Sequence, residues 1–186
     1  SGRCIQKPYE KGRQKDYQMD VANRLKHGEL MSKDSIHFAD SLRYTTLKKH
    51  RTVYGGGGIM PDNFVALDTT QYTPFHRQLA AKSVIVRQNL RYVDAHRKQL
   101  KSAYPDFAAF RRDFEVPQSL VDAIVEEGKK QNITPKDDQE LQKTIPYLRN
   151  QLKALIARDL WDMSEYYAIV NETNDIVKRA LQLMGY

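Results

Sequence analysis

Cysteine and long hydrophobic runs are both scarce in this sequence of 186 residues. Cys4 is the only cysteine, so an internal disulfide is impossible and the residue does not indicate a redox compartment. No apolar run approaches the roughly 20 residues of a membrane-spanning helix, which predicts a protein without a membrane span. A cationic segment followed by an apolar one is also missing near residue 1, and we expect any targeting signal to lie outside this sequence or to have been removed.

The short motifs of common catalytic and metal sites are missing as well. The sequence contains no Gly-x-Ser-x-Gly nucleophile motif and no cysteine accompanied by a patterned histidine. The histidines form no pair at i and i+4 and have no acidic residue at a zinc-binding spacing, so surface or core imidazoles are the favoured interpretation. These histidines are His27, His37, His50, His76 and His96. The residues alone therefore assign no catalytic group, cofactor or metal to this chain.

The formal net charge of +7 is concentrated in the first half of the chain. Residues 1–51 hold 12 Lys and Arg against 6 Asp and Glu, and residues 52–102 hold 7 against 3. Residues 103–186 hold 11 against 14. A basic half can meet nucleic-acid phosphates or anionic lipid. The basic and acidic residues are interspersed here, however, and a solvated basic surface is the favoured interpretation.

A run of four glycines is the feature around which the rest of the sequence is organised. The run consists of Gly55, Gly56, Gly57 and Gly58, and it is followed by Ile59, Met60, Pro61 and Asp62. Because side chains are excluded, we expect positive φ angles or a close approach of other backbone, as part of the fold rather than as a flexible spacer. A phosphate-binding loop is disfavoured, since no Lys-Ser or Lys-Thr follows and Pro61 removes a backbone donor.

The chain before the glycines is predicted to hold short elements. Residues 1–8 are typical of a strand, and the spacing of Tyr17, Val21 and Leu25 predicts a helix over 16–27 that ends at Gly28. Residues 28–41 are predicted to be a loop. Two strands, 42–47 and 52–55, are then predicted to form a hairpin around a polar turn.

After residue 72 the chain is predicted to be helical almost to its end. Thr73 and Pro74 are a helix start signal, and a stripe of apolar residues predicts one helix as far as Ala103, ended by Pro105. The stripe consists of Leu79, Val86, Val93 and Leu100, with Leu90 between. Further helices are predicted over 106–114, from Pro117, from the Thr134–Pro135 start signal to Leu160, and over 174–184.

Three side-chain groups in the helical part need an interpretation. Asp137, Asp138 and Glu140 resemble paired acid and base carboxylates, but their place after a helix start signal favours an interaction with the helix dipole. Pro146 should kink or split its helix. The aromatic residues Trp161, Tyr166 and Tyr167 are interpreted as core or subunit contacts.

These elements predict a mainly α fold with two parts. Residues 1–71 would form a small α+β part with short strands, the loop and the glycine-rich corner. Residues 72–186 would form an all-helical C-terminal domain of about five helices.

Three motifs, in this order, resemble the carboxyl-terminal processing, or tail-specific, serine peptidase family. They are residues 1–9 (SGRCIQKPY), 34–42 (DSIHFADSL) and 52–62 (TVYGGGGIMPD). The helical remainder, notably residues 152–161 (LKALIARDLW), is similar to the tail of members from Bacteroides-like bacteria. The resemblance spans essentially the whole chain.

The resemblance implies an enzyme whose reactive groups are not in this chain. The family cleaves polypeptides near their C-termini with a serine nucleophile and a lysine general base, and both precede the first motif, as does the PDZ domain that helps to present the substrate. Residues 1–71 would then be the end of the catalytic domain, a remnant in which Gly58, Ile59, Pro61 and Asp62 close the core near the active site. Family members are generally exported to the periplasm or cell envelope.

Two other interpretations remain open at this point. A non-catalytic helical module could use the stripes of residues 79–100 and 141–160 to bind a partner or a second copy. The basic first half could bind nucleic acid. The preferred interpretation is instead that the partners are polypeptide substrates and a possible second copy of the chain, with no nucleic acid.

Overall fold

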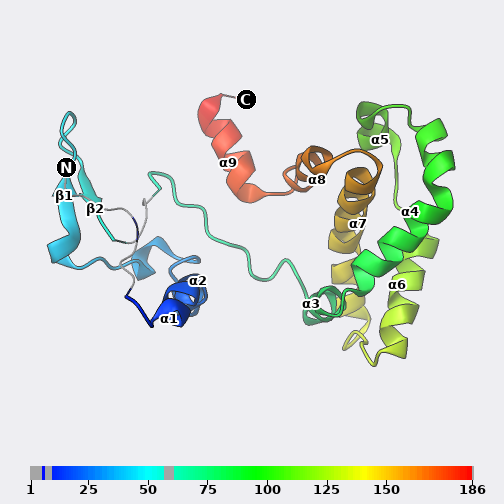
Figure 1. The fold of residues 1–186 in the computed structure, drawn as a ribbon, viewed down its shortest axis with the longest axis horizontal. Helices are drawn as coiled ribbons and strands as arrows, with labels where there is room; N and C mark the ends of the chain where they lie inside the picture. The colour runs from blue at the N-terminus through cyan, green and yellow to red at the C-terminus, as the bar shows by residue number, and fades with distance from the viewer. Residues whose placement is uncertain (1–5, 7–9, 57–60, 186) are drawn as a thin grey trace. The chain divides into compact units, whose positions relative to one another are not determined.

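The structure is a computed structural model that describes residue 6, residues 10–56 and residues 61–185. The chain divides into two compact units, Ser1–Asp68 and Thr69–Tyr186. Within the described ranges there are nine α-helices and one antiparallel sheet of two strands, so the mainly α fold class is confirmed (Figure 1). No helix in these ranges is long and apolar enough to cross a membrane.

The first unit begins with two short helices where one was predicted. α1 (Gln14–Gln18) and α2 (Asp20–Lys26) are separated at Met19, and neither helix has a buried residue. A helix this short has little intrinsic stability, and no buried face holds these two turns in one line. The predicted end at Gly28 is confirmed, because Gly28 has a φ of +77° and its N–H donates to the Leu25 carbonyl.

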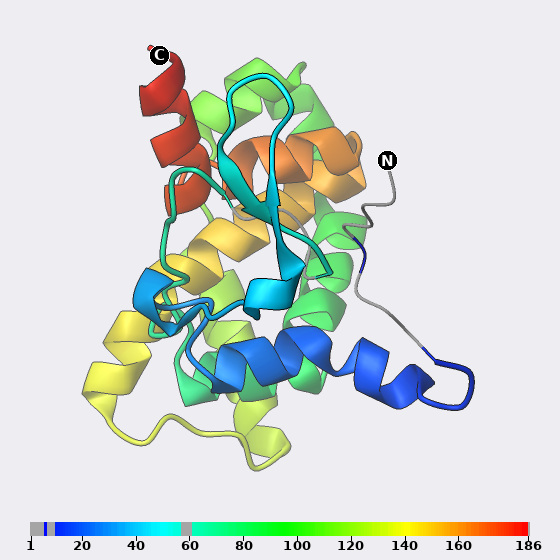
Figure 2. The same cartoon turned by 90° about the vertical axis from the view of Figure 1, so that its left-hand side faces the viewer.

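The predicted hairpin follows and is confirmed. β1 (Arg43–Thr45) and β2 (Thr52–Tyr54) form an antiparallel hairpin (Figure 2). In its register Tyr44 lies opposite Val53. The Thr46 hydroxyl accepts a hydrogen bond from the Arg51 N–H across the turn at 2.9 Å. The predicted loop at 28–41 contains two short 3₁₀ helices, η1 (Lys33–Ser35) and η2 (Asp40–Leu42). Of the strand predicted over 1–8, only Gln6 is described, and it lies in a bend.

The second unit opens with two helices, and the single helix predicted over 74–103 is wrong. α3 (Pro74–Ala81) and α4 (Val84–Ala103) are separated at Ser83, which has a φ of +56°. Because of this break, the buried side of α4 does not continue the apolar stripe that was predicted for one helix. As a result Val84 and Ile85 are fully buried, whereas Leu90 of the predicted stripe is 43% exposed.

Five further helices complete the second unit. They are α5 (Phe107–Asp113), α6 (Gln118–Lys130), α7 (Asp138–Leu160), α8 (Met163–Val170) and α9 (Asp175–Met184). The predictions of α5, of α6 after Pro117 and of α9 are confirmed, but α8 was not predicted and the unit has seven helices rather than about five in the range described.

The start and the interior of α7 differ from prediction. The N-cap is Asp137 rather than Thr134, since the Asp137 carboxylate accepts from the Glu140 N–H. The helix also continues through Pro146 without a split. Proline removes one backbone hydrogen bond, and the buried side chains of Thr144, Leu148 and Leu152 hold both halves of the helix against the core.

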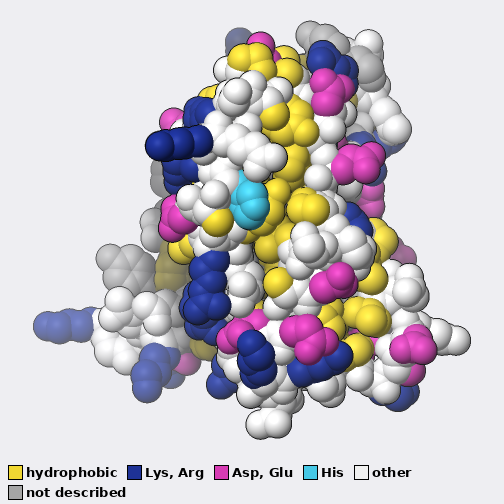
Figure 3. Space-filling view, turned by 90° about the vertical axis from the view of Figure 1, so that its right-hand side faces the viewer, with side chains coloured by type: hydrophobic (Ala, Val, Ile, Leu, Met, Phe, Trp, Pro, Cys, Tyr) yellow, Lys and Arg dark blue, Asp and Glu magenta, His cyan; other side chains and the backbone are white. Residues whose placement is uncertain are grey.

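The core of this unit lies between α4 and α7. α3 and α6 pack against both of these helices, α8 packs against α7, and α9 extends from α8 without a buried residue (Figure 1). On one face of the molecule, hydrophobic side chains form a band with Lys and Arg mainly on one side and Asp and Glu mainly on the other (Figure 3). Trp161 is partly buried against Phe107 and Phe110, whereas Tyr167 is exposed.

Candidate functional site

The glycine run begins as a defined turn at the end of β2. The Gly55 N–H donates to the Leu42 carbonyl at 2.9 Å, which extends the hairpin by one hydrogen bond beyond the strands. Gly56 has a φ of +76°, so the predicted positive φ is confirmed at this residue. Gly57, Gly58 and Ile59 lie outside the described residues.

The residues after the glycine run contact the hairpin through an ion pair. Asp62, which follows Pro61, places its Oδ1 3.2 Å from Nη1 of Arg51. Both side chains are mostly exposed, so this ion pair orients the corner more than it stabilises the fold. Among the described residues, no serine, threonine or cysteine side chain is hydrogen-bonded to a lysine or histidine side chain.

A second candidate site lies where α3 meets α7, and it starts from two buried threonines. The Thr144 hydroxyl donates to the Glu140 carbonyl at 2.7 Å, so the Thr73 hydroxyl is the donor in the 2.6 Å bond between the two side chains. The Thr73 oxygen in turn accepts the His76 N–H and caps α3, as the Thr73–Pro74 signal predicted.

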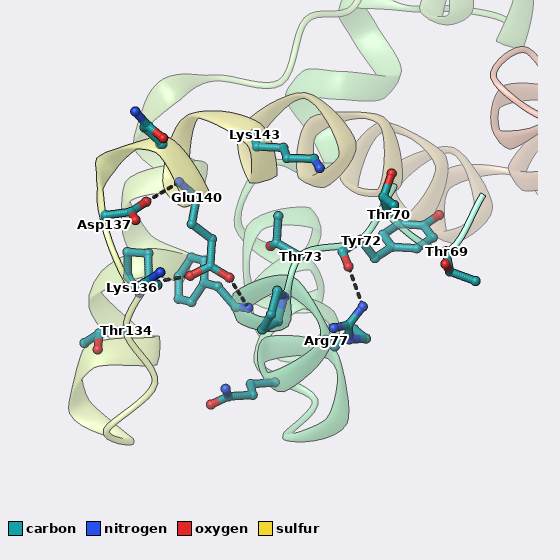
Figure 4. Close-up of a pocket in the computed structure, with 15 residues that line it drawn as sticks. Thr69, Thr70, Tyr72, Thr73, Arg77, Thr134, Lys136, Asp137, Glu140 and Lys143 are labelled. Carbon is teal, nitrogen blue, oxygen red and sulfur yellow. Dashed lines mark hydrogen bonds between the residues drawn. The ribbon is translucent and has the colours of Figure 1, made fainter. Parts of the chain in front are cut away.

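Glu140 connects both helix starts. Its Oε1 accepts the Phe75 N–H at 2.9 Å and its Oε2 accepts the Lys136 N–H at 2.7 Å, while its own N–H donates to Asp137 (Figure 4). The position of Asp137 and Glu140 at a helix start is confirmed. The carboxylate of Glu140 thus supplies acceptors to donors on two segments that are 61 residues apart in sequence, at 75 and 136.

His76 lies beneath this junction and is 4% exposed. Its Nε2 is 2.9 Å from the amide oxygen of Gln151, and since that oxygen only accepts, Nε2 carries the proton. Burial lowers the pKa of His76, because a charged imidazolium would lose its hydration there. The ring of Tyr72 stacks on the imidazole with centroids 4.8 Å apart, and burial raises the pKa of Tyr72.

A cavity of about 790 Å³ opens over the junction. Figure 4 shows Lys143 on α7 and Arg77 on α3 near the segment of Thr69 to Thr73, and Lys136 in the loop before α7 beside Glu140. Arg77 Nη1 donates to the Tyr72 carbonyl at 2.7 Å, which fixes the guanidinium at one side of the opening. No pattern in the sequence predicted this cavity, although the Asp-x-x-Glu spacing at 137–140 is a capping-box pattern that could have indicated its polar edge.

No group of three His, Cys, Asp or Glu side chains that could hold a metal ion occurs in the part of the chain that the structure describes. The carboxylates of the junction are instead occupied by backbone N–H groups. The groups that this arrangement presents to a ligand are cations and hydroxyl groups.

Comparison with known proteins gives a match to a protein family. Residues 75–162 match a family whose description reads "Family of unknown function (DUF8443)". No curated protein and no solved structure matches this chain. The matched segment runs from the second residue of α3 to the residue after the C-cap of α7. It therefore contains His76 and Glu140 of the α3 and α7 junction. Thr73 and the segment before it lie outside the match.

Proposed function

We propose that this chain is the C-terminal part of a carboxyl-terminal processing serine peptidase, with the nucleophilic serine and the lysine base encoded before residue 1. The observation that supports this most is the built turn at the glycines. β2 leads directly into Gly55 and Gly56, and the first of these is hydrogen-bonded back to Leu42. A tether between domains would have neither this bond nor the ordered pair of Arg51 and Asp62 on its far side.

In this proposal the chain contributes architecture rather than chemistry. A lysine that is kept neutral by desolvation would take the proton of the serine in the upstream segment, and this chain would complete the edge of that core. The helical unit would then influence assembly or access to the cleft. The protein would act on polypeptides in the periplasm or cell envelope.

The test compares two proteins. One is the 186-residue chain alone, and the other is the same chain preceded by the polypeptide that its gene encodes upstream. Cleavage of an internally quenched peptide should be undetectable with the chain alone and measurable with the longer protein, and it should disappear when the upstream serine is replaced. An upstream segment without a serine and lysine pair, or a longer protein without hydrolysis, would refute the proposal.

A matched pair of glycine substitutions tests the role of the turn. Gly56→Val places a β-branched side chain at a φ of +76°, and Gly12→Val does so at a φ of +92° where an added Cβ meets nothing within 4 Å. In the longer protein, Gly56→Val should reduce kcat/KM by about tenfold or more, since misplacement near a site is costly. Gly12→Val should change it less than about twofold.

A second candidate function, a helical module for self-association, is favoured by α9. None of its residues is buried, and its apolar side chains lie on one side of the helix. These side chains are Ile176, Val177, Ala180, Leu181, Leu183 and Met184. Sedimentation velocity of the 186-residue chain should show a dimer that Ile176→Glu with Leu181→Glu dissociates, whereas Arg179→Glu with Gln182→Glu on the polar side should not. A monomer at concentrations of about 100 μM would exclude this candidate.

A further inference from the structure

The cavity over α3 and α7 is lined by cations that no carboxylate neutralises. Arg77, Lys136 and Lys143 line it, and within the described part of the chain none of the three has an acidic group within ion-pair distance. Some other exposed cations of this unit do have such partners, for example Arg111 with Glu172 and Lys129 with Glu126. The three cations of the cavity are therefore available to a ligand.

The two acidic side chains of the lining are already engaged by the protein. Both oxygens of Glu140 accept backbone N–H groups, and Asp137 accepts another. These bonds also satisfy N–H groups at the starts of both helices, so the helix ends are not the source of the proposed binding. With three cations and two carboxylates, the side chains of the lining sum to a charge of +1. The remaining positive potential is carried by the lysine and arginine side chains that line the cavity (Figure 4).

Apolar groups line the cavity between these cations. Phe75 is buried beneath it, Pro74 and Pro135 form part of its wall, and the ring of Tyr72 is 44% exposed beside it. The volume of about 790 Å³ is far larger than an inorganic ion needs and falls in the range of sites for small organic molecules. A ligand that fills it would contact both the apolar wall and the cations.

We propose that this cavity binds a small organic anion, in which a carboxylate or phosphate group is attached to an apolar ring or chain. The anionic group would contact Lys143 and the free N–H donors of Arg77, whose guanidinium is positioned by its bond to the Tyr72 carbonyl. The apolar part would lie against Pro74 and Tyr72. This assignment does not depend on the peptidase proposal, because every group that it uses lies in the helical unit.

The test uses four probes on the isotope-labelled 186-residue chain, followed by NMR chemical shifts of the backbone amides. The probes are phenyl phosphate, benzoate, benzamide and inorganic phosphate. Phenyl phosphate or benzoate should shift amides of residues 69–78 and 134–143 with a Kd on the order of millimolar, as expected for fragments of this size. Benzamide, the neutral analogue, and inorganic phosphate, which lacks the ring, should each bind at least about fivefold more weakly. The tighter of the two organic anions identifies the preferred group.

Variants locate the site. Lys143→Ala should weaken binding of the preferred probe by about fivefold, and added salt should weaken it further, because the contact is an exposed charge pair. Lys98→Ala removes an exposed lysine from α4, outside the cavity, and should change the affinity by less than about 1.5-fold. Equal binding of benzamide and benzoate, shifts confined to other residues, or equal effects of the two lysine variants would overturn the proposal.

Discussion

Glu140 Oε1 lies 2.9 Å from the backbone nitrogen of Phe75, so a carboxylate in the first turn of α7 satisfies a donor in the first turn of α3. The partner oxygen accepts from Lys136 in the same way. A glutamate at this position of a helix normally serves only its own helix start. Here it also fixes where α3 begins relative to α7, and this relationship shapes the cavity above.

Replacement of Glu140 should destabilise the helical unit. Glu140→Ala leaves the N–H groups of Phe75 and Lys136 without their acceptors and should lower the free energy of unfolding by about 2–3 kcal/mol. Glu140→Gln keeps one good acceptor oxygen and should cost about half as much. Urea unfolding followed by the fluorescence of Trp161, the single tryptophan, measures the difference.

Glu126→Ala is the matched control for this loss of a glutamate. Glu126 lies on an exposed face of α6 and pairs only with Lys129, three residues away, in the described part of the chain. Its replacement should cost less than about 0.5 kcal/mol. If Glu140→Ala were as mild as this control, the two backbone bonds would not contribute to the stability of the junction.

His76 predicts a pH dependence of stability. Its pKa is lowered in the fold by burial from the ordinary value of 6.5, so the unfolded chain takes up a proton that the folded chain resists. Stability should therefore be full above about pH 6.5 and fall as the pH drops toward the lower folded pKa, by at most about 1.4 kcal/mol per pH unit.

The pH test compares urea unfolding at several values between pH 7.5 and 5.5, where most carboxylates stay ionised. His76→Gln cannot gain this proton and should lose the slope that His76 contributes, even if it is less stable at every pH. His96→Gln, which removes an imidazole from α4, should keep that slope. Parallel curves for the wild type and His76→Gln would contradict the assignment.

The sequence predicted the helical elements where the start and stop signals are local. Thr73, Asp106 and Asn174 mark helix starts that the structure has, because capping is decided by a side chain and the next three residues. Pro117 marks a fourth start without a side-chain cap. The hairpin and the positive φ at Gly56 were predictable for the same reason. The break at Ser83 was not, since a serine in a left-handed conformation carries no sequence signal and the apolar spacing continues across it.

The candidate site could be predicted from the sequence less well than the helices. The partners of Glu140 and His76 are distant in the chain, and periodicity within one segment gives no information on such pairs. Asn89 shows the same limit. It is fully buried and its Nδ2 donates to Asp159 on α7, but its sequence position predicts only a polar interruption in α4.

Ser83 predicts a stabilising substitution. Its φ of +56° is costly for a residue with a Cβ, so Ser83→Gly should raise the free energy of unfolding by about 0.5–1 kcal/mol. Ser102→Gly is the control, because Ser102 is exposed in the last turn of α4 and the same change should cost up to about 0.5 kcal/mol there. Thermal unfolding of both variants distinguishes relief of backbone strain from a general effect of glycine.

Replacing Gly128 by alanine should destabilise the helical unit, whereas replacing Ser83 by glycine should stabilise it. Gly128 lies inside α6, where alanine is favoured over glycine by about 1 kcal/mol. An added Cβ, however, would lie 2.8 Å from Cδ2 of the fully buried Leu79 and 3.1 Å from the carbonyl oxygen of Ile133.

The contact therefore decides the sign at Gly128. The carbonyl belongs to the backbone and Leu79 is enclosed by the core, so neither can move away cheaply, and Gly128→Ala should destabilise the unit by about 1–3 kcal/mol despite the gain in helix propensity. Ala123→Gly, at an exposed position of the same helix, calibrates that propensity term and should cost about 1 kcal/mol. A stabilised Gly128→Ala variant in urea unfolding would mean that α6 can move away from α3, and that the two helices are less closely packed than these distances require.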